Sequence, residues 1–105
     1  MDETEHQYWS RMWITARKNM PRIHERYMGS PTVLRALLGY SIVTKSGRKM
    51  SCAQHVYTAI ARGDKPRNPK QARLLTMLAG PHGKSIAKAI AIRRGLDISK
   101  YKVWP

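Results

Sequence analysis

The chain has 105 residues and carries 20 Lys and Arg against 6 Asp and Glu, which gives a formal charge of +14. Its apolar fraction of 42% is too high for a disordered basic tail, and no apolar run reaches the roughly eighteen residues that a membrane span needs. The length predicts a single domain, and the lone Cys52 together with the expected absence of a secretory signal favours the cytoplasm.

Apolar residues at three- and four-residue spacing predict a first helix over about residues 3–19. Three carboxylates stand at its start, where they interact favourably with the helix dipole. Pro21 ends this helix, and a further helical turn is expected over residues 22–27. The predicted apolar stripe consists of Trp9, Met12, Trp13, Ala16 and Met20.

Ser30-Pro31 predicts a second helix, because a serine cap followed by proline at the first helical position is a typical helix start. This helix ends near Gly39, and its apolar residues are Val33, Leu34, Leu37 and Leu38. Residues 40–50 combine strand-favouring and turn-favouring residues, so we expect a loop with at most a short strand.

A third helix is expected to start after Ser51 and to end at Gly63, followed by a basic loop over residues 64–67. Asn68-Pro69 repeats the cap-and-proline signal and opens a fourth helix that closes at Gly80. The apolar residues are Ala53, Val56, Tyr57 and Ile60 in the third helix and Ala72, Leu74, Leu75 and Leu78 in the fourth.

A last helix is expected from Lys84 or Ser85 to Arg94, with Ile86, Ala89 and Ile90 facing inward. The tail, residues 99–105, contains Tyr101, Val103 and Trp104, which predict that it docks back on the domain. The fold class is therefore all-α, a small compact bundle of about five short helices.

Residues 53–78 contain a helix ending in Ile60-Ala61-Arg62-Gly63, a basic turn and a Leu-rich helix. This pattern resembles the second half of a lambda-repressor-like or Cro-like helix-turn-helix domain. The chain departs from that family at Tyr57, where a small aliphatic residue is usual, and at residues 40–50, which replace the preceding helix. Two ordinary amphipathic helices joined by a basic loop fit the same residues.

The resemblance implies that Gln54, His55 and Thr58 face a DNA groove, where their polar groups suit base edges. The charge distribution predicts the phosphate contacts, because residues 1–25 are neutral and the whole net charge lies on residues 26–105. The predicted phosphate-binding residues are Lys45, Arg48, Lys49, Arg62, Lys65, Arg67, Lys70, Arg73, Lys84, Lys88 and Arg94.

Other site chemistries find little support in the sequence. Residues 80–85 resemble the end of a phosphate-binding P-loop but lack its first glycine and a preceding strand, so nucleotide hydrolysis is rejected. A zinc site would need Cys52 and His55 plus two ligands from His6, His24 or His82, which have no recognisable spacing. We expect no catalytic residues, metal or cofactor, although a metal-free ribonuclease using His24, His55 or His82 remains an alternative.

The sequence thus favours a non-enzymatic, nucleoid-associated DNA-binding regulator of the phage or mobile-element type. The neutral first helix is a possible homodimerisation element. Two alternatives remain open: an RNA- or ribonucleoprotein-binding factor, whose unpaired bases would stack on Tyr8, Trp9, Trp13 or Trp104, and a basic inhibitor of an acidic host-protein surface.

Overall fold

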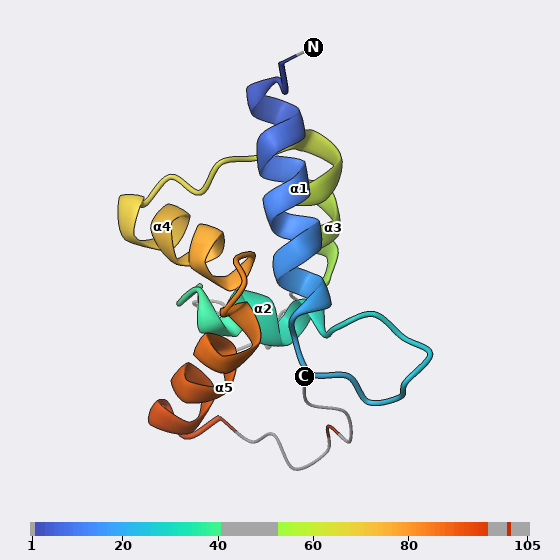
Figure 1. Cartoon of the computed structure of the whole chain (residues 1–105), viewed down its shortest axis with the longest axis vertical. Coiled ribbons are helices and arrows are strands. Elements are labelled where there is room, and N and C mark those ends of the chain that lie inside the picture. Colours follow the sequence, from blue (N-terminus) through green and yellow to red (C-terminus); the bar gives the residue numbers. More distant parts are fainter. Residues whose placement is uncertain (1, 41–52, 97–100, 102–105) are drawn as a thin grey trace, which may run out of the picture.

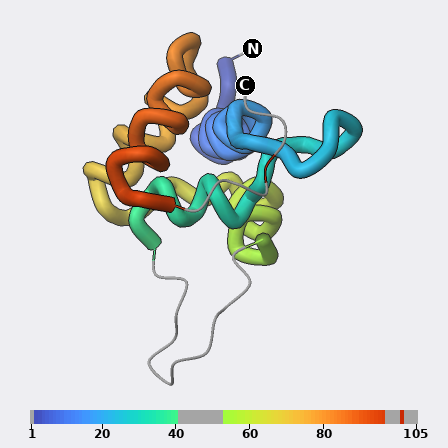
Figure 2. Tube along the Cα trace, turned by 90° about the horizontal axis from the view of Figure 1, so that it is seen from below, coloured from blue at the N-terminus to red at the C-terminus, as the bar shows by residue number. Residues whose placement is uncertain are grey.

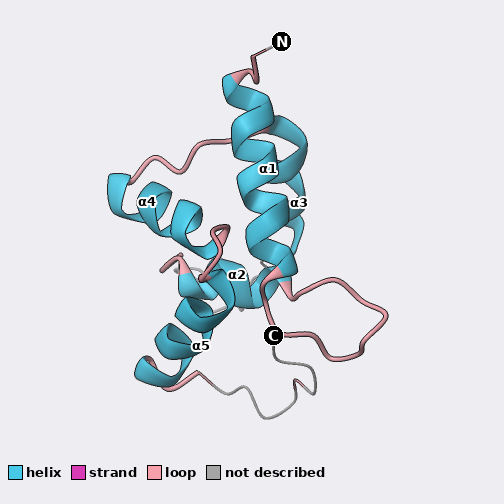
Figure 3. Cartoon of the chain, in the orientation of Figure 1, coloured by secondary structure: helices cyan, strands magenta, loops and turns pink. Residues whose placement is uncertain are grey.

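The computed structural model describes residues 2–40, 53–96 and 101, and within this part of the chain it confirms the all-α class (Figures 1 and 3). The helices are α1 (Glu5–Lys18), α2 (Pro31–Leu37), α3 (Ala53–Arg62), α4 (Pro69–Leu78) and α5 (Gly83–Arg93). None of these helices is long and apolar enough to cross a membrane.

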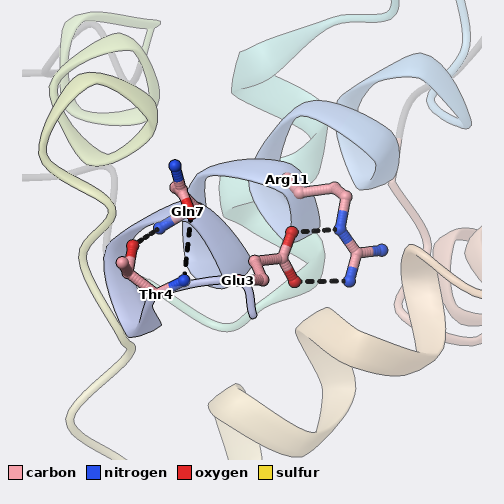
Figure 4. Close-up of polar contacts among 4 residues, drawn as sticks. All are labelled: Glu3, Thr4, Gln7 and Arg11. Carbon is pink, nitrogen blue, oxygen red and sulfur yellow. Dashed lines mark hydrogen bonds and ion pairs between the residues drawn. The ribbon is translucent and has the colours of Figure 1, made fainter. Parts of the chain in front are cut away.

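Helix α1 starts at a capping box that the sequence analysis overlooked. The Thr4 hydroxyl accepts a hydrogen bond from the Gln7 amide, and the Gln7 side chain accepts one from the Thr4 amide (Figure 4). This reciprocal pair satisfies two amides that a helix start leaves without partners. Beside it Arg11 forms a two-bond ion pair with Glu3, and these hydrogen bonds lower the pKa of the Glu3 carboxyl.

Helix α1 is the element around which the others pack. It contacts α3, α4 and α2, whereas α5 packs on α4 and α2. Figure 2 looks along α1, with α4 and α5 on one side of it and α3 on the other. All five residues of the predicted α1 stripe are buried, and the core around them consists of Val33, Leu34, Leu37, Leu38, Val56, Ala59, Ala72, Leu75, Leu78, Ala87 and Ala91.

Both predicted cap-and-proline starts are confirmed. The Ser30 hydroxyl accepts from the Val33 amide at the start of α2, and the Asn68 side-chain oxygen accepts from the Lys70 amide at the start of α4. Proline costs nothing at these positions, because the first helical amide has no partner within the helix.

The predicted helical turn over residues 22–27 is limited to one hydrogen-bonded turn, in which the Tyr27 amide donates to the His24 carbonyl over 3.1 Å. This segment belongs to a loop over residues 21–30, whose ends are joined by a hydrogen bond from the Ser30 amide to the Pro21 carbonyl, 3.0 Å long. The return is tight, because a Cβ on Gly29 would lie 1.9 Å from the Arg17 carbonyl oxygen. Within ten residues the chain reverses and returns to the end of α1, so the segment holds one turn and no helix.

Two residues predicted to face inward are exposed. Tyr57 points outward from α3, where Arg17 lies over its ring, and the inward positions of α3 are Val56 and Ala59. Ala89 is also exposed, because the inward line of α5 runs through Gly83, Ala87 and Ala91. The small residues on that line allow α5 to pack closely against the end of α4. A Cβ on Gly83 would lie 2.0 Å from the Leu78 carbonyl oxygen.

Several predictions fall outside the described residues, namely the Ser51 cap, Val103, Trp104 and all of residues 40–50 except Tyr40. Tyr101 is described, and it packs against the core with its hydroxyl 3.4 Å from the Ser30 hydroxyl. This contact agrees with the expected docking of the tail.

We expect Leu75→Ala to lower the free energy of unfolding by about 2–5 kcal/mol, because Leu75 is fully buried and its loss leaves a cavity between α4 and the core. Met77→Ala in the same helix is the matched control, and it should change stability by less than about 0.5 kcal/mol because Met77 is half exposed. Urea unfolding followed by circular dichroism measures both. Equal effects would contradict the placement of α4.

Candidate nucleic-acid interface

A basic groove of about 610 Å³ lies where α3, the connection to α4 and the end of α2 meet. Helix α3 contributes His55, Thr58 and Arg62, the following connection contributes Asp64, Lys65, Arg67 and Asn68, and the α2 end contributes Arg35 and Tyr40. Two of the three predicted base-reading residues and three of the predicted phosphate-binding residues are thus brought together.

The α3 residues of the basic groove share one side of the helix. His55, Thr58 and Arg62 are spaced by three and four residues, which places them in one row along the helix surface. The row lies beside the buried positions Val56 and Ala59 on the helix surface. His55 and Arg62 are exposed and Thr58 is partly exposed. Helix α3 therefore presents polar side chains along one wall of the groove.

Helix α1 holds this wall in place through three side-chain donors. His6 Nδ1 donates to the Arg62 carbonyl over 2.7 Å, Ser10 donates to the Ile60 carbonyl, and Trp13 Nε1 donates to the Asp64 carbonyl over 2.7 Å. The Ile60 and Arg62 carbonyls belong to the last turn of α3, whose carbonyls lack the usual i+4 donor within the helix, and the Asp64 carbonyl lies two residues beyond its end. The connection that carries Lys65 and Arg67 is fixed by the same bonds.

Gly63 makes this close approach of α1 possible. Its φ of +64° is a left-handed conformation that only glycine adopts at low cost. A Cβ here would also lie 2.3 Å from the His6 carbonyl oxygen. The glycine that the sequence marked as a helix stop thus also brings the connection against α1.

Arg35 is a groove residue that the sequence analysis missed. Its guanidinium carbon lies 4.1 Å from the centre of the Tyr40 ring, a cation–π contact. Its Nε is buried and has no hydrogen-bond partner among the described residues. Burial raises the pKa of the Tyr40 hydroxyl, while the Arg35 charge acts in the opposite direction. The neutral ring orients a planar cation toward the groove.

The groove cations have no carboxylate partners within the described residues, where the single ion pair joins Arg11 and Glu3. Arg35, Arg62, Lys65 and Arg67 face only one carboxylate in the groove, that of Asp64. The Lys65 Nζ also lies 5.9 Å from the centre of the Trp9 ring, a cation–π contact. The groove is therefore a concentration of positive charge that suits an external anion.

The other predicted phosphate-binding residues are distributed around the groove. Lys70 and Arg73 are exposed on α4, and Arg73 lines a smaller depression of about 400 Å³ with Lys65 and Arg67. Lys84 and Lys88 are exposed on α5, and Gln54 is exposed on α3 without lining the groove. Lys45, Arg48 and Lys49 lie outside the described residues.

Arg94 has a structural role at the end of α2. Its Nη1 donates to the Ala36 carbonyl over 2.9 Å and to the Leu37 carbonyl over 2.7 Å. The Ala36 carbonyl also accepts from the Gly39 amide over 3.0 Å, so Arg94 adds to the backbone hydrogen bonds at the end of α2. A cation at a helix C-terminus also complements the helix dipole. Its guanidinium is thus already engaged within the domain.

The residues considered for other chemistries are dispersed. His24 lies in the 21–30 loop, His55 on α3 and His82 just before α5. Among the described residues no three His, Cys, Asp or Glu side chains form a group that would hold a metal, and Cys52 is not described. Trp9 and Trp13 are buried in the core of the single chain, so the stripe that motivated a dimer is covered by the chain's own helices.

Comparison with known proteins gives no relative for this chain. No protein-family model, curated protein or solved structure matches it. The case for its function rests on its own residues.

We expect Arg94→Ala to destabilise the fold by roughly 0.5–1.5 kcal/mol, because the Ala36 and Leu37 carbonyls at the end of α2 lose the hydrogen bonds that Arg94 donates. Arg93→Ala removes the same charge from an exposed neighbour and should leave the melting temperature almost unchanged. Thermal unfolding of the two variants makes the comparison. Identical melting temperatures would argue against the capping role.

Proposed function

We propose that the protein is a non-enzymatic DNA-binding protein, a small regulator that acts on the nucleoid, and that it binds duplex phosphates in the basic groove. The observation that carries this proposal is the set of four cations around the groove without an ion pair to a described carboxylate. A folded chain keeps such unpaired cations together at an electrostatic cost, which a polyanion relieves.

The surface of α3 favours a duplex as the polyanion. Gln54 and Ala61 form the outer ridge of the helix, opposite the buried Val56 and Ala59. On one side of this ridge lies the basic groove, and on the other side Arg17 lies over Tyr57, 4.8 Å from the ring centre. An exposed helix with cations on both sides fits a major groove, which is about 12 Å wide and bordered by two phosphate strands.

The buried tryptophans argue against the stacking of unpaired RNA bases on Trp9 and Trp13. Proteins that bind unpaired bases present exposed aromatic rings as stacking surfaces. Here Trp9 and Trp13 are core residues, and Tyr8 is only partly accessible. Within the described part of the chain, the groove supplies cations and polar groups rather than a row of exposed rings.

Binding to a labelled DNA duplex should weaken steeply with salt. With six to eight phosphate contacts, we expect log K to fall against log salt with a slope of roughly −5 to −7. Arg62→Ala and Lys65→Ala should each reduce the slope by about 1 and weaken binding. Arg11→Ala is the matched control, since it removes one positive charge that is already paired with Glu3.

The same titration separates the alternatives. A flat salt response with duplex DNA would overturn the proposal. A clear preference for structured RNA of equal length would support the RNA-binding alternative. Weak binding to both nucleic acids would indicate that the positive charge serves to bind an acidic protein surface.

We expect Arg35→Lys to weaken DNA binding although it conserves the charge. Lysine lacks the planar group that stacks on Tyr40 and presents several donors to one phosphate. The affinity should fall by about 3- to 10-fold, corresponding to roughly 0.7–1.4 kcal/mol. Lys84→Arg is the reverse exchange on α5 and should have little effect. Unchanged binding by Arg35→Lys would mean that Arg35 contributes only its charge.

A further inference from the structure

The 21–30 loop exposes apolar side chains that the fold itself does not need. It projects from the bundle beyond the end of α1 (Figures 1 and 2). Ile23, Tyr27 and Met28 have exposed fractions of 57%, 68% and 43%. They make up three of the six large apolar side chains that are exposed in the described part of the chain. Such clustering marks a surface that meets a partner.

The loop is built to hold this tip in a defined shape. Its ends are joined through Ser30 and Pro21, the Tyr27 amide donates to the His24 carbonyl, and Arg22 Nη1 donates to the Glu25 carbonyl. The Tyr27 ring also packs edge-on against His24, with ring centres 5.7 Å apart. A compact loop with close ends and internal contacts loses little conformational entropy when it binds.

The surroundings of the tip are cationic. A depression of about 240 Å³ beside Tyr27 and Met28 is lined by Lys18, Arg22 and Arg26 against the single carboxylate of Glu25. Apolar side chains flanked by Arg and Lys are the combination with which proteins enter the minor groove of DNA, where the apolar groups insert at base steps.

Arg17 links this loop to the α3 surface. Its guanidinium donates to the Gly29 carbonyl over 3.0 Å and to the Tyr57 hydroxyl over 3.0 Å, and it contacts the Met28 sulfur at 3.8 Å. Tyr57 is itself exposed on α3. Arg17 therefore joins the end of the loop to the Tyr57 side of α3, across the outer ridge of this helix from the basic groove.

We propose that the 21–30 loop is a second DNA contact, which inserts Ile23, Tyr27 and Met28 into the minor groove adjacent to the major groove occupied by α3. This inference rests on the proposed function. The loop would contact the same duplex as α3, and the inserted side chains would widen the minor groove and bend the DNA. The neighbouring cations would bind the phosphates on either side.

The experiment compares Ile23→Ser with Ile92→Ser, an equally exposed isoleucine on α5 at 64%. Affinity, salt slope and DNA bending are measured on a duplex of about 30 bp labelled for energy transfer at both ends. The wild-type protein should bend the duplex by about 20–90°. Ile23→Ser should weaken binding about tenfold and reduce the bend, while its salt slope stays unchanged, because an apolar contact releases no counterions.

Arg26→Ala should instead reduce the slope of log K against log salt by about 1, because it removes a cation that would contact a phosphate. If Ile23→Ser and Ile92→Ser bind and bend DNA alike while Arg62→Ala still lowers the slope, the loop inference fails and the proposed function stands. If the wild-type protein does not bind DNA, both fail. If Ile23→Ser instead abolishes a self-association seen by sedimentation and leaves DNA binding intact, the loop is a protein interface and the inference is overturned.

Discussion

Three hydrogen bonds from α1 to the end of α3 determine where the positive charge of this protein lies. His6, Ser10 and Trp13 recur at four- and three-residue spacing on one face of α1, and their acceptors are the carbonyls of three alternate residues between Ile60 and Asp64. Helix α1 thereby fixes the end of α3, the reversal at Gly63 and the start of the cationic connection. The basic groove exists because these elements cannot move independently of α1.

The positive charge lies around this organising helix. Helix α1 of the neutral N-terminal segment, residues 1–25, forms the centre of the core. The groove cations are placed around it on α2, α3 and the connection to α4. Among the described residues no charged residue is buried, so the interior remains apolar. The repulsion that remains among the cations is reduced when salt or a polyanion is present.

Local signals in the sequence were sufficient to find the helices. Ser30-Pro31 and Asn68-Pro69 each encode a helix start in two residues, and the α1 stripe encodes a buried face, so these features need no knowledge of the tertiary structure. Tyr57 was misplaced because periodicity counts a tyrosine as apolar, whereas its hydroxyl and ring are both used by Arg17 from another helix. The pairing of Arg35 with Tyr40 was missed because Arg35 is a single charge in an otherwise apolar helix, and its place in the groove is set by the packing of α2 on α3. Likewise, nothing local to Arg94 distinguishes it from its exposed neighbour Arg93.

The bonds between α1 and α3 also bear on how the chain is made. The donors precede their acceptors by 56, 50 and 51 residues, so α1 leaves the ribosome well before its partners exist. At synthesis rates of about 5–20 residues per second, this interval lasts roughly 3–10 s. During that time Trp9, Met12 and Trp13 have no core to enter, and the nascent chain exposes its most apolar stripe. The helix that organises the finished protein is thus also the segment that most needs protection, for instance by a chaperone, while the rest of the chain is being synthesised.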